Sequence, residues 1–237
     1  MGGRNQRLEV TMISAKSTFT VLALLLFVSL GCAENNPQKI KGGAMKLPEP
    51  RYSSKMSVEE ALKSRRSIRS YKDTALSLNE LAQLLWAAQG ITAKWGGRTA
   101  PSAGATYPLE IYAVVGKVEN LEAGLYHYNP QDHTITKQKT GDLRSALANA
   151  ALGQTCVREA PIDLIFAARY ERTTRRYRER GIRYVHMEIG HVGQNIYLQA
   201  EALGLGTVAI GAFYDDKVKK VLGIEEEPLY IMPVGKK

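Results

Sequence analysis

The sequence predicts one large domain in which helices and strands are mixed without strict alternation, behind a separate N-terminal segment. The chain has 237 residues, of which 44% are hydrophobic and 23% charged, and these proportions suit one ordinary globular core or at most two small ones. Helical apolar stripes and short runs of β-branched and aromatic residues both occur. Because they do not alternate regularly, a Rossmann pattern is not expected. The composition also excludes a collagen, a disordered tail and a multi-pass membrane protein.

The first 32 residues are predicted to be a signal peptide. Basic residues precede an apolar run from Val21 to Leu30, which is too short to span a membrane but fits the apolar part of a signal. The run ends at Gly31 and Cys32, which resemble the processing site of a bacterial lipoprotein, although Ser29 and Leu30 are not the residues usual at their positions. An ordinary secretory signal and a simple membrane anchor are the alternatives.

The predicted signal has consequences for the start and the location of the protein. Either Met1 or Met12 can be the initiator, and the second would give a more compact signal. If the signal is used, we expect the protein at the cell envelope or on the periplasmic side, with a lipid anchor on Cys32 in the lipoprotein case. Otherwise we expect it in the cytoplasm.

A flexible tether is predicted between the signal and the folded domain. Residues 33–56 contain Asn-Asn-Pro, Gly-Gly and Pro-Glu-Pro and show no periodicity. The domain is expected to span residues 57–237. It opens with two capping boxes, Ser57 to Glu60 and Ser77 to Glu80, which predict two helix starts, and the second helix ends at Gly90.

The remaining elements follow from periodicity and composition. Runs of β-branched and aromatic residues predict strands, and a turn at 129–132 joins two of them into a hairpin. One continuous apolar stripe predicts a long helix from about residue 184 to 203. In order, we expect strands at 110–116, 124–129 and 134–136, a helix at 142–152, a strand at 162–168, the long helix, a strand at 206–211, a helix at 215–222 and a strand at 229–234.

Cysteine content and charge limit the kinds of site. With only Cys32 and Cys156, a disulfide scaffold and a zinc site built on several thiolates are excluded, and no metal site is expected. Cys156 is interpreted as a small apolar core residue. The formal net charge is +9, and seven arginines lie between Arg169 and Arg183. Such a cluster suits a nucleic acid, an anionic cofactor or substrate, or a solvated helical face.

Three segments contain the residue types that ligand binding needs. The segment Arg65–Arg69 offers three guanidinium groups and a hydroxyl for a phosphate and the polyol beside it, although it can also serve as a cationic helix C-terminus. The small residues from Pro101 to Ala105 let a backbone approach a flat or anionic ligand closely, or simply form a surface turn. Gly211 and Ala212, at the end of a predicted strand, leave room for a flat ring system. No Gly-x-Ser-x-Gly motif supports a hydrolase.

Four motifs occur in a characteristic order. The first is Arg-Arg-Ser-Ile-Arg-Ser-Tyr from Arg65, and the second is Pro-Ser-Ala-Gly-Ala-Thr-Tyr-Pro-Leu-Glu-Ile-Tyr from Pro101. The third is His-Val-Gly-Gln-Asn-Ile-Tyr-Leu-Gln-Ala-Glu-Ala-Leu-Gly-Leu-Gly-Thr from His191, and the last is Met-Pro-Val-Gly-Lys, which ends at Lys236. In this order they resemble the nitroreductase family of FMN-dependent oxidoreductases, and within it the SagB-type dehydrogenase branch, over residues 47–237. The resemblance implies an α+β fold, with a central mixed β-sheet flanked by helices. It also implies an intertwined homodimer with two FMN molecules at its interface.

The resemblance further implies which residues bind FMN. The loop at 101–105 would reach FMN from the other subunit, and residues 210–212 would face its reactive edge. Ala103 and Ala105 stand where relatives often have Ser and Asn, and Gly211 stands where many have Glu, so the polarity of the substrate is left open. The implied cofactor-binding residues are Arg65, Arg66, Ser67, Arg69, Pro101, Ser102, Ala103, Gly104, Ala105, Gln154, Ile210, Gly211, Ala212 and Lys236.

The expected function is an FMN-dependent oxidoreductase that transfers hydride from NAD(P)H to a small organic acceptor, such as a nitro compound or a quinone, by a ping-pong mechanism. Because the flavin carries the hydride chemistry, no dedicated catalytic residue is expected. The alternatives are a SagB-type dehydrogenase of a peptide heterocycle and a non-catalytic flavin-holding envelope protein. Nucleic-acid binding ranks last because glutamates interrupt the Arg-rich segment. We also expect Tyr170, Arg175, Arg176 and Tyr177 to form a lid or substrate rim, with a solvated helix as the alternative.

Overall fold

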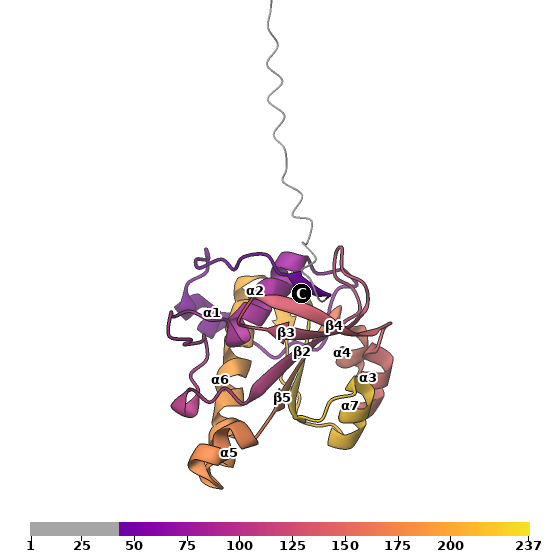
Figure 1. Ribbon diagram of the computed structural model, residues 1–237. Helices are drawn as coiled ribbons and strands as arrows, with labels where there is room; N and C mark the ends of the chain where they lie inside the picture. The colour runs from indigo at the N-terminus through magenta and orange to yellow at the C-terminus, as the bar shows by residue number, and fades with distance from the viewer. Residues whose placement is uncertain (1–42) are drawn as a thin grey trace, which may run out of the picture. The chain divides into compact units, whose positions relative to one another are not determined.

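A seven-stranded sheet is the centre of the domain (Figure 1). The computed structural model describes residues 43–237; the predicted signal at 1–32, Cys32 and residues 33–42 lie outside the described residues. The strand order is β1-β4-β3-β2-β5-β7-β6. The strands are β1 Ala44–Lys46, β2 Leu109–Val115, β3 Gly124–Asn129, β4 Thr134–Thr140, β5 Ile162–Ala168, β6 Leu205–Thr207 and β7 Glu227–Lys236.

All neighbouring pairs of these strands are antiparallel. Parallel pairing enters through isolated bridges, where Ser67 joins the edge strand β6 at Thr207 and Leu76 pairs with Val118. The expected α+β fold with a central mixed sheet is confirmed in this form. The predicted hairpin is also confirmed, because Asn129 pairs with Thr134 across its turn.

Helices cover both faces of the sheet, so that β2 and β5 are buried on both sides. The helices α2 and α6 pack on one face, and α3, α4 and α7 pack on the other (Figure 1). Beyond the 3-10 turn Ala103–Ala105, the helices are α1 Val58–Ser64, α2 Leu78–Gln89, α3 Arg144–Ala150, α4 Thr155–Glu159, α5 Glu171–Tyr177, α6 Arg180–Ala202 and α7 Asp215–Leu222. Among residues 43–237, no helix is both long and apolar enough to cross a membrane.

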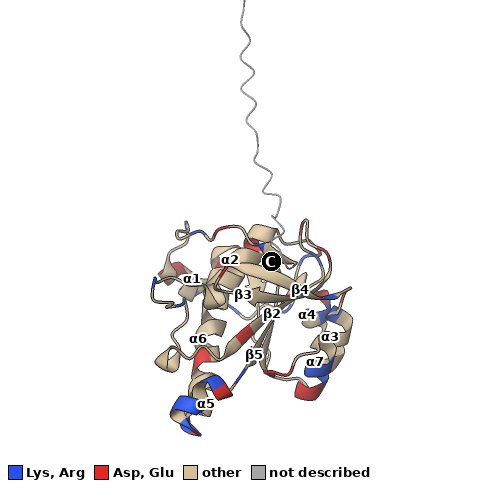
Figure 2. Ribbon diagram, in the orientation of Figure 1, with Lys and Arg blue, Asp and Glu red and all other residues tan. Residues whose placement is uncertain are grey.

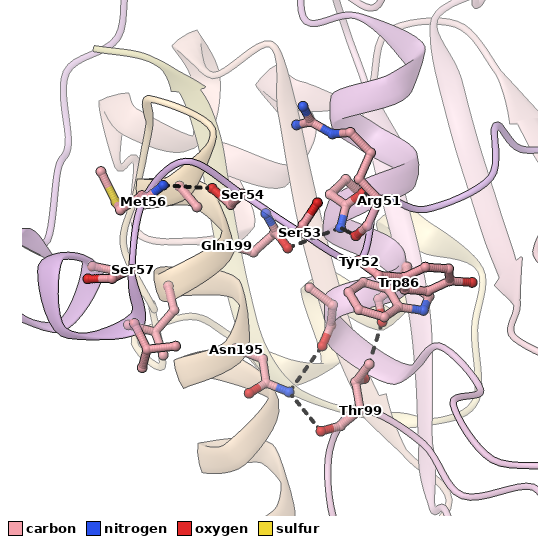
Figure 3. A pocket seen from close by; sticks show the side chains of 16 residues that line it. Arg51, Tyr52, Ser53, Ser54, Met56, Ser57, Trp86, Thr99, Asn195 and Gln199 are labelled. Carbon is pink, nitrogen blue, oxygen red and sulfur yellow. Dashed lines mark hydrogen bonds between the residues drawn. The ribbon is translucent and has the colours of Figure 1, made fainter.

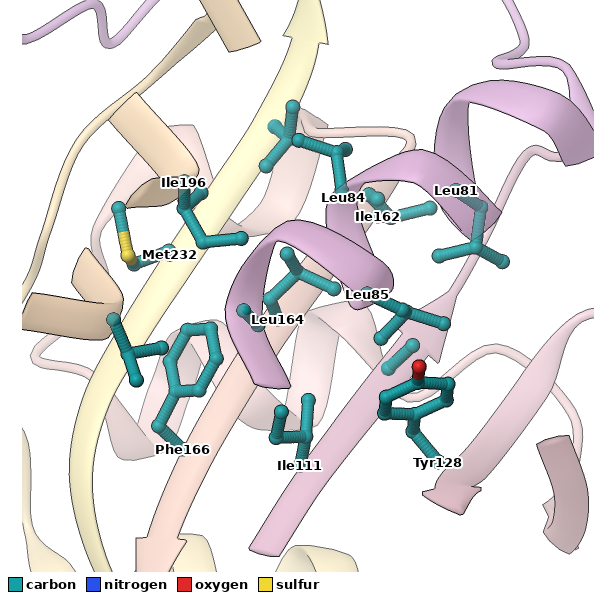
Figure 4. Close-up of a cluster of buried hydrophobic side chains, with 14 of the residues drawn as sticks. Leu81, Leu84, Leu85, Ile111, Tyr128, Ile162, Leu164, Phe166, Ile196 and Met232 are labelled. Atoms are coloured by element: carbon teal, nitrogen blue, oxygen red, sulfur yellow. The ribbon is translucent and has the colours of Figure 1, made fainter. Parts of the chain in front are cut away.

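The apolar stripe of α6 anchors one half of the core (Figure 4). Its buried residues Val185, Ile189, Val192 and Ile196 face the side chains that β5 and β7 direct to the same side of the sheet. Leu81, Leu84 and Leu85 of α2 complete this cluster. Burial of these side chains supplies much of the free energy of folding, at about 25 cal/mol per Å² of apolar surface.

Both predicted capping boxes are confirmed. The Ser57 and Ser77 side chains each accept a hydrogen bond from the backbone N–H three residues later. The carboxylates of Glu60 and Glu80 in turn accept hydrogen bonds from the backbone N–H groups of Ser57 and Ser77. These reciprocal bonds satisfy N–H groups that helix starts leave unpaired. The end of α2 at Gly90 is confirmed as well.

Several boundaries differ from the expectation. The helix α1 ends at Ser64, so the segment Arg65–Arg69 does not extend it but runs on beside β6. The helix α6 begins at Arg180 rather than 184, and the positive φ of Arg178 separates it from α5. The strand expected at 206–211 stops at Thr207, because the Ala209 N–H donates to Tyr197 instead of β7 and only an isolated bridge between Ile210 and Ile231 resumes the pairing.

The second half of the predicted tether belongs to the fold instead. Residues 44–46 form β1, which pairs with β4, and Leu47 is 1% exposed in the core. The Arg51 backbone also exchanges two hydrogen bonds with the Gln83 side chain. Single apolar residues such as Leu47 fix this segment although they produce no periodic pattern.

Candidate functional site

The segment Arg65–Arg69 lies along the edge of the sheet. Ser67 forms a parallel bridge with Thr207 of β6, and the Ile68 N–H donates to the Thr207 carbonyl at 2.9 Å. Within residues 43–237, none of the three arginines of the segment forms an ion pair with an acidic side chain. Unpaired guanidinium groups on an ordered backbone can bind a phosphate.

Two glycines allow this segment to lie close to the sheet. A Cβ atom on Gly206 would lie 2.7 Å from Ile68 Cγ2 and 2.8 Å from its Cβ. A Cβ atom on Gly235 would lie 2.6 Å from the Cβ of Tyr71. The Tyr71 hydroxyl then donates to the carbonyls of Ile68 and Pro233. The close approach of the Ile68 side chain therefore explains why a glycine stands at position 206.

Tyr197 of α6 connects the arginine segment to the chain beyond β6. Its hydroxyl lies 2.9 Å from Ser67 Oγ and accepts a hydrogen bond of 2.9 Å from the Ala209 N–H. The Arg65 guanidinium carbon stands 4.9 Å from the centre of its ring. Sequence reasoning did not select Tyr197 as a site residue, although it lies within the motif from His191 to Thr207 and just outside the apolar stripe of α6.

The predicted strand end at residues 210–212 lies beside this group. Ile210 is buried and exchanges two backbone hydrogen bonds with Ile231 of β7. Gly211 and Ala212 are exposed, and the nearest atom that a Cβ on Gly211 would meet is 3.9 Å away. Gln154, just before α4, donates to the Ala212 carbonyl at 2.9 Å. The structure therefore brings Gln154 to the open end of this strand.

Lys236 lies at the end of β7, and its ammonium group pairs with the carboxylate of Glu80. Burial raises the pKa of Glu80, but hydrogen bonds from Lys236 and Ser77 outweigh it and the net pKa is lowered. Within the single chain, Lys236 therefore has an acidic partner, unlike the arginines of Arg65–Arg69.

The predicted loop at 101–105 packs against α5. Arg176 donates to the Gly104 carbonyl at 3.3 Å, and a Cβ on Gly104 would lie 2.5 Å from the Tyr177 hydroxyl oxygen. The Ser102 hydroxyl accepts from the Tyr107 N–H at 2.9 Å. Gly104, Ala105 and Tyr107 all have positive φ, so the loop holds a tight and partly strained path.

A buried carboxyl group lies beneath this loop. Glu188 of α6 is 2% exposed, accepts a hydrogen bond from Gln89 at 3.2 Å and is also hydrogen-bonded by Ser102. Burial raises the pKa of Glu188 to about 7, although these hydrogen bonds and the charge of Arg98 oppose the shift. The protonation of Glu188 therefore changes near neutral pH, next to a predicted cofactor-binding residue.

The two groups of predicted residues lie at different ends of α6. Glu188 and Tyr197 are nine residues apart, which corresponds to about 14 Å along a helix. Figure 1 shows α1, which leads into Arg65–Arg69, near one end of α6 and α5 near the other. Within one chain, the segment Arg65–Arg69, residues 210–212 and Gln154 therefore lie together. The loop at 101–105 instead packs against α5.

A cavity of about 420 Å³ lies elsewhere, between residues 51–58, α1, α2 and α6 (Figure 3). Tyr52 and Trp86 meet edge to face at its wall, and Asn195 donates to the carbonyls of Ala87 and Thr99. None of the predicted cofactor residues lines this cavity.

The other reactive side chains of the described part are structural. Cys156 is buried, as expected, in the core on the face of the sheet that α3, α4 and α7 cover, and burial raises the pKa of its thiol. Asp163 is fully buried without a hydrogen-bond partner, and burial raises the pKa of its carboxyl well above the usual value. Residues 43–237 contain no group of three or more His, Cys, Asp or Glu side chains placed to hold a metal ion.

The segment Arg65–Arg69, together with the neighbouring residues 210–212, fits a flat cofactor that carries a phosphate. Its guanidinium groups suit the phosphate, and the exposed backbone of Gly211 and Ala212 leaves the adjacent surface open. FMN combines these features.

Comparison with known proteins agrees with the fold. The chain is 53% identical over 180 residues to a protein of Methanocaldococcus jannaschii named a candidate nitroreductase, over 76% of this chain and 91% of that protein. It is 29% identical to the microcin B17-processing protein of Escherichia coli, over 58% of this chain but only 54% of that protein. The crystal structure of a candidate nitroreductase from Ralstonia eutropha matches with 31% identity and a TM-score of 0.72, over 84% of this chain and 93% of that one.

A sequence model of the Nitroreductase family matches residues 62–236. The match covers every implied cofactor residue from Arg65 to Lys236, together with Tyr197. The chain belongs to the Nitroreductase family, a family of oxidoreductases.

Proposed function

We propose that this protein is an FMN-dependent oxidoreductase that uses NAD(P)H to reduce a small organic acceptor. The observation that carries this proposal is the group of unpaired guanidiniums on Arg65–Arg69 beside the open strand end at Gly211 and Ala212. Bound FMN would supply the hydride chemistry, alternating between donor and acceptor in a ping-pong cycle.

The residues of the chain would bind and orient the cofactor. Arg65, Arg66 and Arg69 would hold its phosphate, and Ser67 would donate to the polyol. The backbone of 210–212 would contact the ring system, with Gln154 fixing the carbonyl of Ala212. No acid or base within hydrogen-bond reach of these groups is needed for hydride transfer.

We propose that the complete site forms in a homodimer. The loop at 101–105 and the arginine segment lie at opposite ends of α6 in one chain. If two copies pack with their long helices antiparallel, the loop of one can approach the arginines of the other. Both groups then contribute to one site without any rearrangement inside the chain.

The visible spectrum of the purified full chain tests the cofactor, and anaerobic addition of NADPH tests the donor. We expect an oxidised-flavin spectrum that bleaches with NADPH. The variant Arg66→Ala should bind FMN more weakly without a change in fold, because Arg66 bonds only to the backbone carbonyls of Lys63 and Arg65. A colourless protein that does not bind added FMN contradicts the proposal, and a flavin that does not bleach favours another donor or a holding role.

A second candidate is oxidation of a heterocycle in a peptide, as in the SagB-type branch. The similarity to the microcin B17-processing protein favours it. Incubation of the flavin-loaded protein with a thiazoline-containing peptide distinguishes the two functions. Loss of two hydrogen atoms from the peptide, measured by mass spectrometry, supports the dehydrogenase, whereas turnover only with NADPH and a quinone supports the reductase.

We also propose that Cys32 carries a lipid and holds the protein at the cell envelope. Labelling of cells with a radioactive fatty acid tests this. The expected label on the full chain is absent from Cys32→Ser, and an unlabelled wild-type protein contradicts the proposal.

A further inference from the structure

Tyr197 contacts three residues, from two segments of the chain, in or next to the proposed site. Its hydroxyl meets Ser67 Oγ and the Ala209 N–H, each at 2.9 Å, and its ring lies under the Arg65 guanidinium at 4.9 Å. These partners come from the segment after α1 and from the chain beyond β6.

The hydrogen bonds of the hydroxyl have a direction. A tyrosine hydroxyl has one proton and can accept from other donors. Because Ala209 is a donor, the oxygen of Tyr197 is the acceptor in that contact. If its own proton goes to Ser67 Oγ, the proton of Ser67 is free to point outward, where Ser67 is exposed. Ser67 is then oriented as a donor to a ligand oxygen.

The ring has a different effect. Arg65 is half-buried and no acidic side chain of the described residues pairs with it. A guanidinium held over an aromatic face keeps its N–H edges available, while the ring restricts its position. The ring therefore restricts the position of the Arg65 guanidinium while leaving its positive charge available to an anion.

We propose that Tyr197 is a positioning residue of the flavin site. Its ring and its hydroxyl orient groups that bind different parts of the ligand. The ring holds Arg65 toward the phosphate, and the hydroxyl fixes Ser67 and the backbone at Ala209 for the remainder of the flavin. This inference rests on the proposed function, and it adds a residue that touches the cofactor only through others.

Comparison of FMN with riboflavin, which lacks the phosphate, tests this division. Fluorescence titration of the full-length apoprotein gives the Kd of each ligand for the wild type, Tyr197→Phe and Tyr197→Leu. Tyr197→Phe keeps the ring but loses the hydrogen bonds to Ser67 and Ala209, so both Kd values should rise to the same extent, by about three- to tenfold, as expected when Ser67 no longer donates a well-oriented hydrogen bond to the ligand. Tyr197→Leu removes the ring as well, so the Kd of FMN should rise at least fivefold more than that of riboflavin.

Tyr126→Phe is the matched control. Tyr126 lies on β3, and its hydroxyl donates to the Glu122 carbonyl just before that strand; its removal should leave both Kd values unchanged. Thermal unfolding of each variant separates loss of binding from loss of folding. Equal effects of Tyr197→Leu on both ligands, or wild-type Kd values in Tyr197→Phe, overturn the role of Tyr197. A wild-type protein that binds neither flavin overturns the proposed function itself, and the inference with it.

Discussion

The two ends of α6 hold their neighbours in different ways. Near its C-terminal end, Tyr197 joins Arg65, Ser67 and Ala209 through neutral hydrogen bonds and a ring contact. Toward its N-terminal end, the loop at 101–105 lies over the buried carboxyl of Glu188 and has residues with positive φ. The residues of the first arrangement include no carboxyl group, whereas the second contains a buried carboxyl group and a strained backbone. We infer that the arginine half of the proposed site is the rigid half.

Glu188→Gln should produce the largest effect and remove the pH dependence of the loop end. Burial raises the pKa of Glu188 from 4.5 to about 7, so between these values the unfolded chain releases a proton that the folded chain keeps. The free energy of unfolding should therefore fall as pH rises from about 4.5 through 7, by at most about 3 kcal/mol. Urea unfolding at pH 5 and pH 8 measures this fall. It should be smaller in the variant by the contribution of Glu188, because the buried Asp163 carboxyl, whose pKa is also raised, contributes equally to both proteins.

The same series compares the two ends directly. Tyr197→Phe should retain the full pH dependence of the wild type, because Glu188 is unchanged and the lost hydroxyl contacts Ser67 and Ala209 rather than a carboxyl group. If Glu188→Gln unfolds with the same pH dependence as the wild type, Glu188 is not the titrating group and the contrast between the two ends fails.

Gly206→Ala should displace the segment Arg65–Arg69, which belongs to the half of the proposed site that we infer to be rigid. The added Cβ would lie 2.8 Å from the Cβ of Ile68, which cannot rotate away, so the segment Arg65–Arg69 must move off the sheet. We expect a loss of about 2 kcal/mol in the free energy of unfolding, typical of an overpacked site, together with weaker FMN binding. Gly190→Ala is the control for folding, since no atom lies within 4 Å of its added Cβ. Equal stability of the two variants would show that the segment is loosely held.

Much of the fold could be predicted because its signals are local. The capping boxes at Ser57 and Ser77 place both helix starts, and the apolar stripe of α6 predicts the helix that organises one core cluster. The strand β1 was missed because its three residues gain their partners from β4, far away in the sequence. Pairing of that kind depends on tertiary context rather than on local pattern.

The site was predictable only in part for a similar reason. The residue types in Arg65–Arg69 indicate phosphate binding, but no sequence pattern indicates that Ile68 needs Gly206 or that Tyr197 meets Ser67 and Ala209. The first two of these contacts, Ile68 with Gly206 and Tyr197 with Ser67, join segments about 130 to 140 residues apart in the chain, so local pattern cannot reveal them. Which residues bind FMN therefore remains a prediction, whereas their arrangement is a finding.

Charge at the loop end can be tested with Arg175→Ala and Arg176→Ala. Figure 2 shows basic residues concentrated along α5, and no acidic side chain of the described residues pairs with either arginine. If α5 forms the rim of the site, the double variant should raise the KM for NADPH about fivefold with little change in kcat. The difference should shrink in 0.5 M salt, since exposed charges are then screened.

Arg158→Ala on α4 is the control for net charge and should leave the KM unchanged. The single variants separate two effects, because Arg176 also donates to the Gly104 carbonyl whereas no such contact is recorded for Arg175. An unchanged KM in the double variant contradicts the rim and leaves α5 as a solvated helix.

The smallest effect expected is that of Ala105→Gly, which examines the strain at the loop end. Ala105 has a φ of 53°, a conformation that a Cβ disfavours by about 1 kcal/mol, while a new glycine makes the unfolded chain more flexible. The two effects oppose one another, so the free energy of unfolding should change by no more than about 0.5 kcal/mol. Ala103→Gly, where φ is not positive, relieves no strain and should lose about 0.5 to 1 kcal/mol. If both variants lose the same amount, the loop stores no strain at Ala105, and Glu188 alone distinguishes the two ends of α6.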